Sequence, residues 1–174
     1  MMKNLEKDKL KILLDIIGSN PALQIAHFAQ SGEIIVNMLS EYCQERDYLY
    51  QINAIDNTFY EHLSEKFKNI DTTQVKKFPL ERKSYMIQGK QYDFLFVTAT
   101  IDNEIRADFL KKVHHVMRNA GNIVIFISKG DLAERDNWTT LLEEKNYVAT
   151  NTIDDLFENY DIIISKKMHG WGGK

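Results

Sequence analysis

Two nearly continuous apolar runs with a helical stretch between them constrain the fold of this chain more than any other feature. Residues 92–98 read Tyr-Asp-Phe-Leu-Phe-Val-Thr, and residues 122–128 carry Ile-Val-Ile-Phe-Ile at their centre. Runs of this kind are typical of strands in a parallel sheet that helices cover on both faces. Residues 105–118 place apolar side chains at helical spacing and are followed by Asn-Ala-Gly, a turn signal. The sequence therefore predicts a right-handed crossover unit at the centre of an α/β fold.

The same alternation of strands and helices extends to both sides of this unit. The remaining patterns predict strands at residues 22–26, 50–55, 74–80, 147–152 and 160–165, and helices at residues 1–18, 31–45, 58–70 and 131–145. Ser31 and Asp131 are the expected N-caps of the helices that they begin. Pro79 and the lysines near it place the strand at 74–80 on a sheet edge. Only about seven residues separate the last two strands, too few for a crossover helix, so we expect an antiparallel hairpin.

Together these elements predict a three-layer, Rossmann-like α/β fold with a seven-stranded, mostly parallel sheet and a C-terminal antiparallel hairpin. A length of 174 residues suits one domain, so we expect a single domain over residues 1–174, with an N-terminal helix in 1–20 and a tail at 166–174. Trp171 in that tail is too large an apolar group to leave exposed without reason. We expect it to fold back on the domain, to bind a second subunit of a homodimer, or to be disordered.

Composition argues against several classes of partner. The formal net charge of −3 provides no strong basic field, so no nucleic acid is expected to bind. No stretch approaches the ~20 apolar residues that a membrane-spanning helix needs. Asp15 interrupts the apolar run within residues 1–18, so we interpret that segment as an amphipathic helix on the sheet rather than a secretory signal or a membrane-surface helix. The single Cys43 fits a buried position in a cytoplasmic protein.

The connection after the first strand is the expected functional corner of the sheet. Pro21 ends the preceding helix, and residues 22–32 read Ala-Leu-Gln-Ile-Ala-His-Phe-Ala-Gln-Ser-Gly. In an open α/β sheet, ligands bind beyond the carboxyl ends of the strands, where the following helix contributes unpaired N–H groups. His27 lies at this predicted edge, where a general base could stand, although the sequence identifies no second group to act with it.

Three stretches resemble motifs of the class I S-adenosylmethionine-dependent methyltransferases, and the order of elements resembles that family across residues 21–166. Residues 23–32 resemble the first motif, an apolar strand before a glycine-rich turn, and residues 50–56, Tyr-Gln-Ile-Asn-Ala-Ile-Asp, resemble the second strand. Residues 109–125 resemble the helix, glycine turn and fifth strand that follow the fourth motif. The resemblance implies a transferase with S-adenosylmethionine as its cofactor. It also implies a pocket between the ends of the first and fourth strands, with the candidate cofactor-binding residues His27, Phe28, Gly32, Asp56 and Thr98.

The chain departs from the family pattern within the first motif. Gln24, Ala26, Phe28 and Gln30 stand where the family has an acidic residue and glycines, and Gly32 stands in a glycine position. Glycine there lets the backbone approach the cofactor closely. We therefore expect Phe28 to fill part of the pocket, and we expect replacement of Phe28 and Ala26 by glycine to strengthen binding of the cofactor.

Asp56 has two interpretations. In the family, the acidic residue that ends the second strand hydrogen-bonds the ribose hydroxyls of the cofactor. An aspartate after a strand also commonly caps the following helix. Both roles remain open from the sequence.

A metal site is not expected. Thr98 and Thr100 end the fourth strand where many relatives carry an acidic or asparagine residue, and a neutral hydroxyl does not replace a carboxylate as a base or a metal ligand. His114 and His115 point in different directions from one helix, and His62 is helical without an identifiable partner. We interpret the three histidines as packing or solvated side chains.

Two classes of function follow from the sequence. The first is an S-adenosylmethionine-dependent methyltransferase whose acceptor is not readable and whose chemistry depends chiefly on in-line positioning of that acceptor. The alternative is a non-catalytic Rossmann-like domain with a structural or protein-binding role. The partner is accordingly expected to be a small molecule or a protein.

Overall fold

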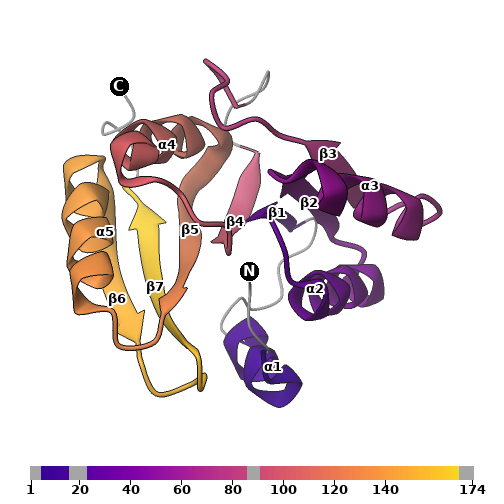
Figure 1. Cartoon of the computed structure of the whole chain (residues 1–174), viewed down its shortest axis with the longest axis horizontal. Helices are drawn as coiled ribbons and strands as arrows, with labels where there is room; N and C mark the ends of the chain where they lie inside the picture. The colour runs from indigo at the N-terminus through magenta and orange to yellow at the C-terminus, as the bar shows by residue number, and fades with distance from the viewer. Residues whose placement is uncertain (1–4, 16–22, 86–90, 169–174) are drawn as a thin grey trace.

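The computed structural model describes residues 5–15, 23–85 and 91–168 (Figure 1). Its strands are β1 (Gln24–Ala29), β2 (Leu49–Ala54), β3 (Thr73–Lys77), β4 (Tyr92–Val97), β5 (Met117–Ser128), β6 (Tyr147–Ile153) and β7 (Tyr160–Lys167). Its helices are α1 (Lys7–Asp15), α2 (Glu33–Arg46), α3 (Asn57–Lys66), α4 (Asn103–Val116) and α5 (Leu132–Glu144). The kinds of element and their order agree with the sequence prediction.

The described strands form one sheet in the order β3-β2-β1-β4-β5-β7-β6. β1 pairs in parallel with β2 and β4, β2 pairs in parallel with β3, and β4 pairs in parallel with β5. Of the strands described, only β7 runs opposite to the direction of the others, and it pairs antiparallel with β5 and β6. The predicted seven-stranded, mostly parallel sheet with a C-terminal antiparallel hairpin is thus confirmed. β3 lies at a sheet edge, as Pro79 and the lysines near it predicted.

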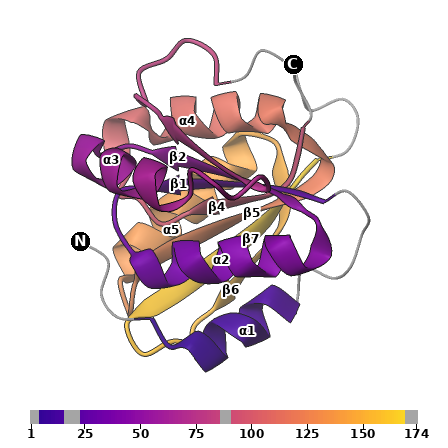
Figure 2. The ribbon, with the colours of Figure 1, turned by 90° about the vertical axis from the view of Figure 1, so that its right-hand side faces the viewer.

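Helices cover both faces of the sheet, and the side chains of β1 alternate between the two layers of core. Ile25 and Ala29 join side chains of α1, α2 and α3 in one cluster. Ala26 and Phe28 join side chains of α4 and α5 in the other. Figure 2 shows α1 and α2 beneath the sheet and α4 above it. Both faces of the central strands are therefore buried, which explains their nearly continuous apolar sequences.

The first strand ends later than predicted, and the helix after it begins later than predicted. β1 continues through His27 and Phe28 to Ala29, because β2 and β4 flank it and supply pairing partners along this length. The N-cap of α2 is Gly32, at φ 102°, rather than Ser31. A left-handed backbone of this kind favours glycine, so the residue is suited to the turn that it makes.

The connection between α4 and β5 also differs. The predicted turn at residues 119–121 lies inside β5, which begins at Met117 directly after the helix. Ala120 takes a left-handed conformation at φ 64°. At Gly121 an added Cβ would lie 2.9 Å from the carbonyl oxygen of Arg118, so only glycine fits without a shift of the backbone.

Other sequence expectations have mixed outcomes. The one cysteine occupies the environment that the sequence predicted. Cys43 is fully buried in α2, and burial raises the pKa of its thiol to about 12. The predicted helix end at Gly18, Pro21 and Trp171 lie outside the described residues. Lys166 and Lys167, which were expected to begin the tail, belong to β7. Within the described ranges, no helix is both long enough and apolar enough to cross a membrane.

Candidate functional site

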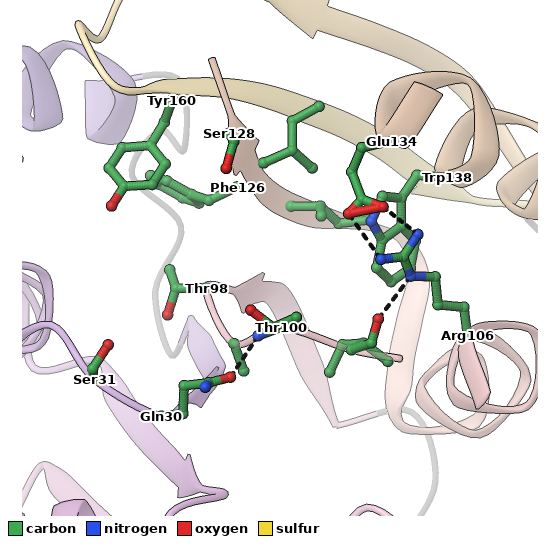
Figure 3. A pocket seen from close by; sticks show the side chains of 14 residues that line it. Gln30, Ser31, Thr98, Thr100, Arg106, Phe126, Ser128, Glu134, Trp138 and Tyr160 are labelled. Carbon is green, nitrogen blue, oxygen red and sulfur yellow. Dashed lines mark hydrogen bonds and ion pairs between the residues drawn. The ribbon is translucent and has the colours of Figure 1, made fainter. Parts of the chain in front are cut away.

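A cavity of about 130 Å³ lies at the carboxyl ends of the central parallel strands (Figure 3). The strand order reverses between β1 and β4, because the chain builds outward from β1 to β3 and then returns to the other side of β1. Ligands of open α/β sheets bind at such a switch point. The lining comes from the β1–α2 connection, the ends of β4 and β5, the helices α4 and α5, and the start of β7: Gln30, Ser31, Thr98, Ala99, Thr100, Ile101, Arg106, Ile125, Phe126, Ile127, Ser128, Glu134, Trp138 and Tyr160.

Two side-chain hydrogen bonds join the end of β1 to the end of β4 beside this cavity. The side-chain oxygen of Gln30 accepts a hydrogen bond from the backbone N–H of Thr100 at 2.6 Å. Oγ1 of Thr98 lies 2.8 Å from Nε2 of His27. These bonds hold the two strand ends together at the switch point.

His27 lies directly behind the cavity wall rather than in it. Its side chain is fully buried, with Nδ1 2.7 Å from the hydroxyl of Tyr50 and Nε2 on Thr98. Burial lowers the pKa of His27 to about 3. Neither hydrogen-bond partner is a carboxylate that would stabilise an imidazolium. The ring is therefore neutral near pH 7 and reaches the cavity only through Thr98.

The buried imidazole makes the protein sensitive to acid. The unfolded chain takes up a proton on His27 near pH 6.5, but the folded chain does so only near pH 3. Protonation of His27 therefore does not affect the free energy of unfolding above pH 6.5. Below pH 6.5 it lowers that free energy by about 1.4 kcal/mol for each pH unit until the pH approaches 3, which amounts to about 2 kcal/mol between pH 6.5 and 5. Burial also lowers the pKa of His114, which adds loss in the same direction.

Urea denaturation at pH 7 and pH 5 measures this effect. We expect His27→Gln to remove most of the difference between the two pH values, and His114→Gln to remove a smaller part. An equal pH dependence in the wild type and in His27→Gln would contradict a neutral, buried His27.

The structure places Phe28 in β1 with its side chain in the core, and not in the cavity that it was expected to fill in part. Its side chain is 1% exposed and makes edge contacts with Phe78 and Phe109, each at a ring-centroid distance of 5.1 Å. Tyr85 packs on the same ring at 5.7 Å. Phe28 does not line the cavity. The aromatic ring therefore fills the space between β1, the segment after β3, and α4.

Two further candidate residues lie at the same edge of the sheet but outside the cavity lining. Oδ2 of Asp56 accepts a hydrogen bond from the backbone N–H of Phe59 at 2.9 Å, so Asp56 caps α3. Gly32 caps α2 and follows Ser31, which does line the cavity. Of the five candidate cofactor-binding residues, only Thr98 lies in the cavity wall.

Sequence reasoning missed the charged pair on the far wall of the cavity. Arg106 in α4 is 4% exposed, and its two terminal nitrogens contact the two carboxylate oxygens of Glu134 in α5 at 2.6 and 2.8 Å. The Nε–H of Arg106 donates to the carbonyl oxygen of Ile101 at 2.8 Å, and a terminal N–H also donates to Oδ1 of Asn137 at 2.7 Å. The guanidinium lies over the ring of Trp138. No spacing signal in the sequence connects α4 with α5. The pair is neutral as a unit, so it gives the cavity no free charge.

His62 and His114 each contact a neighbouring side chain away from the cavity. His114 packs against the ring of Tyr147, and the prediction of a packing role is confirmed. His62 is not without a partner as predicted, because it contacts Glu33 and keeps the pKa of that carboxyl below its usual value. Within the described part of the chain, no three histidine, cysteine or acidic side chains lie together as a metal site would require.

Comparisons with known proteins bear on the fold. No known sequence family matches this chain, and no curated protein matches it. An S-adenosylmethionine-dependent methyltransferase from Aquifex aeolicus is 15% identical, with a TM-score of 0.71 over 91% of this chain and 89% of its own. An S-adenosylmethionine-dependent O-methyltransferase from Thermotoga maritima is 9% identical, with a TM-score of 0.70 over 98% of this chain and 68% of its own.

A carbon methyltransferase, CurJ, gives a similar result. It is 14% identical, with a TM-score of 0.69 over 90% of this chain. This chain spans about half the length of CurJ and of the citrinin polyketide synthase CMeT domain, at 52% and 51%. The topology and the cavity define a Rossmann-like α/β protein with a crevice at its switch point. Its fold is that of the class I S-adenosylmethionine-dependent methyltransferases, as the three motifs predicted.

Proposed function

We propose that this chain is an S-adenosylmethionine-dependent methyltransferase-like protein that binds the cofactor across the carboxyl ends of β1 and β4. The observation that supports this most is the position of the cavity, at the switch point of a methyltransferase fold. Gly32 adds support, because its left-handed backbone forms the turn between β1 and α2 beside that cavity.

The cavity is too small for a nucleoside cofactor, so the cost of opening it lowers the expected affinity. About 130 Å³ is below the roughly 300–1,000 Å³ of ordinary ligand sites, so a nucleoside cofactor needs the site to open. The hydrogen bond between Gln30 and Thr100 joins the two strand ends beside the cavity, and we propose that it breaks when the site opens. One such bond contributes about 0.5–1.5 kcal/mol, or roughly tenfold in affinity at most. We therefore propose a site that closure weakens but does not abolish.

The described lining offers hydroxyl groups but no free base. Both carboxylate oxygens of Glu134 contact Arg106, and His27 is neutral behind Thr98. Methyl transfer from a sulfonium needs in-line positioning, and it needs a base only when the acceptor is protonated. We therefore propose an acceptor that is already nucleophilic when it binds.

Calorimetric titration of the full chain with S-adenosylhomocysteine tests the proposed function. We expect saturable binding with a dissociation constant between micromolar and millimolar, and stabilisation by roughly 1.4 kcal/mol at ten times that concentration. No heat and no thermal shift at millimolar ligand would support the second candidate, a non-catalytic domain with a structural or protein-binding role. That candidate is favoured by the packing of Ala26 and Phe28, which stand where the family's first motif has glycines.

Two variants of Asp56 separate its capping role from the proposed contact with the cofactor. Asp56→Ala removes the cap on α3 and is expected to cost about 1 kcal/mol of stability, whereas Asp56→Asn keeps the cap. A charged hydrogen bond to a ribose hydroxyl is about 1–1.5 kcal/mol stronger than a neutral one. We therefore expect Asp56→Asn to retain full stability and to bind S-adenosylhomocysteine roughly tenfold more weakly. Unchanged affinity in both variants would place the ligand away from β2.

A further inference from the structure

A chain of three hydrogen-bonded side chains leads from the core to the cavity. The hydroxyl of Tyr50 on β2 contacts Nδ1 of His27 on β1, and Nε2 of His27 contacts Oγ1 of Thr98 after β4. Tyr50 is 1% exposed and His27 is 0% exposed, whereas Thr98 is half-buried and lines the cavity. A hydroxyl next to an imidazole suggests a nucleophile with its base. The direction of the protons decides whether Thr98 has that role.

The buried hydroxyl of Tyr50 sets this direction. Within the described ranges its one hydrogen-bond partner is Nδ1 of His27, so its proton has an acceptor only when Nδ1 carries no proton. The opposite tautomer leaves a buried hydroxyl proton unpaired, which disfavours that tautomer by about 5- to 150-fold. The neutral ring of His27 then carries its proton on Nε2 and donates it to Thr98. A protonated Nε2 cannot take a proton from Thr98, so the arrangement is not that of a nucleophile and its base.

The hydroxyl proton of Thr98 is therefore directed away from His27. No described residue accepts it, and the side chain lines the cavity. Gln30 provides a second donor beside it, because a backbone N–H can only donate and so fixes the oxygen of the Gln30 amide toward Thr100. Figure 3 shows Gln30 and Thr98 at the same end of the cavity, away from Arg106 and Glu134.

We propose that Thr98 is a specificity-determining hydrogen-bond donor, and that the cavity selects ligands that present a carboxylate, carbonyl or phenolate oxygen to it over ligands that present an N–H group. His27 and Tyr50 are positioning residues that act through Thr98. The inference rests on the proposed function only in taking the cavity as a ligand site, and it is independent of the identity of the cofactor.

Nitrogen-15 NMR of the full chain labelled in histidine tests the proton direction without any ligand. We expect His27 to carry its proton on Nε2 at pH 7. A proton on Nδ1 would overturn the proposal, because Thr98 would then donate to His27 and present only lone pairs to the cavity.

Benzoate and benzamidine test the selectivity, since they are similar in size but opposite in hydrogen bonding, and a cavity of ~150 Å³ accommodates benzene. Binding is followed through the NMR signal of the backbone amide of Ala99, a cavity-lining residue that the wild type and both Thr98 variants share. We expect benzoate to bind at least about tenfold more tightly, and Thr98→Val to weaken benzoate about tenfold while changing benzamidine less than about twofold. Thr98→Ser keeps the hydroxyl and should retain the wild-type preference.

Three results would overturn the proposal: equal affinity for the two probes, equal losses in Thr98→Val, or no benzoate binding at millimolar concentration. If Thr98→Val does not fold, the wild type and Thr98→Ser still give the comparison. A preference for benzoate without binding of S-adenosylhomocysteine would reject the proposed cofactor and leave this inference standing.

Discussion

Replacement of Phe28 by alanine is expected to lower the free energy of unfolding by about 3–5 kcal/mol, the range for a fully buried phenylalanine. The ring is 1% exposed and touches Phe78, Tyr85 and Phe109, so its loss removes apolar contacts on several sides and leaves a cavity in the core. Guanidinium denaturation monitored by circular dichroism measures the change. The variant is not expected to bind S-adenosylhomocysteine more tightly, because the ring does not line the cavity.

Two control variants make the Phe28 measurement specific. Phe28→Leu keeps most of the apolar volume and should cost clearly less. Leu132→Ala truncates a side chain that is 57% exposed and should change stability by no more than about 0.5 kcal/mol. A stable Phe28→Ala protein with tighter ligand binding would restore the interpretation, drawn from the family resemblance, that Phe28 blocks the pocket.

Replacement of Arg106 by methionine is expected to cost about 3 kcal/mol, at the lower end of the range for a broken buried ion pair. The substitution removes the partner of Glu134, the donor to the carbonyl oxygen of Ile101, and the cation over Trp138. The side chain of Glu134 is 27% exposed, so water can solvate its carboxylate when the guanidinium is absent. The expected loss of stability therefore lies at the lower end of the range. Because the pair forms one wall of the cavity, ligand affinity should fall as well.

A matched control for Arg106 is Arg118→Met. Arg118 contacts Asp93 at 3.7 Å but is 44% exposed, and exposed ion pairs contribute about 0–1 kcal/mol. The double variant Arg106→Met with Glu134→Leu should recover part of the loss, because it leaves no unpaired charge. A cost below about 1 kcal/mol for Arg106→Met would show that the pair does not support the cavity wall.

Local patterns in the sequence predicted most of the fold. The continuous apolar runs of β4 and β5, the Asp131 cap of α5 and the short connection between β6 and β7 each follow from the chemistry of neighbouring residues. Their order then leaves few possible topologies, because crossover connections between parallel strands are right-handed. The same order supported the family resemblance, although the glycine positions of the first motif hold other residues.

The end of β1 and the composition of the cavity wall depended on the tertiary structure. Side chains alternate between the faces of a strand, so the surroundings of His27 and Phe28 depend on how far β1 continues, and pairing with β2 and β4 decides that length. Arg106 and Glu134 meet only because α4 and α5 pack beside each other. The sequence by itself determined which segments form strands and helices, since that depends on residues close along the chain. Only the tertiary structure decided which side chains meet at the switch point, because those contacts join residues far apart in sequence.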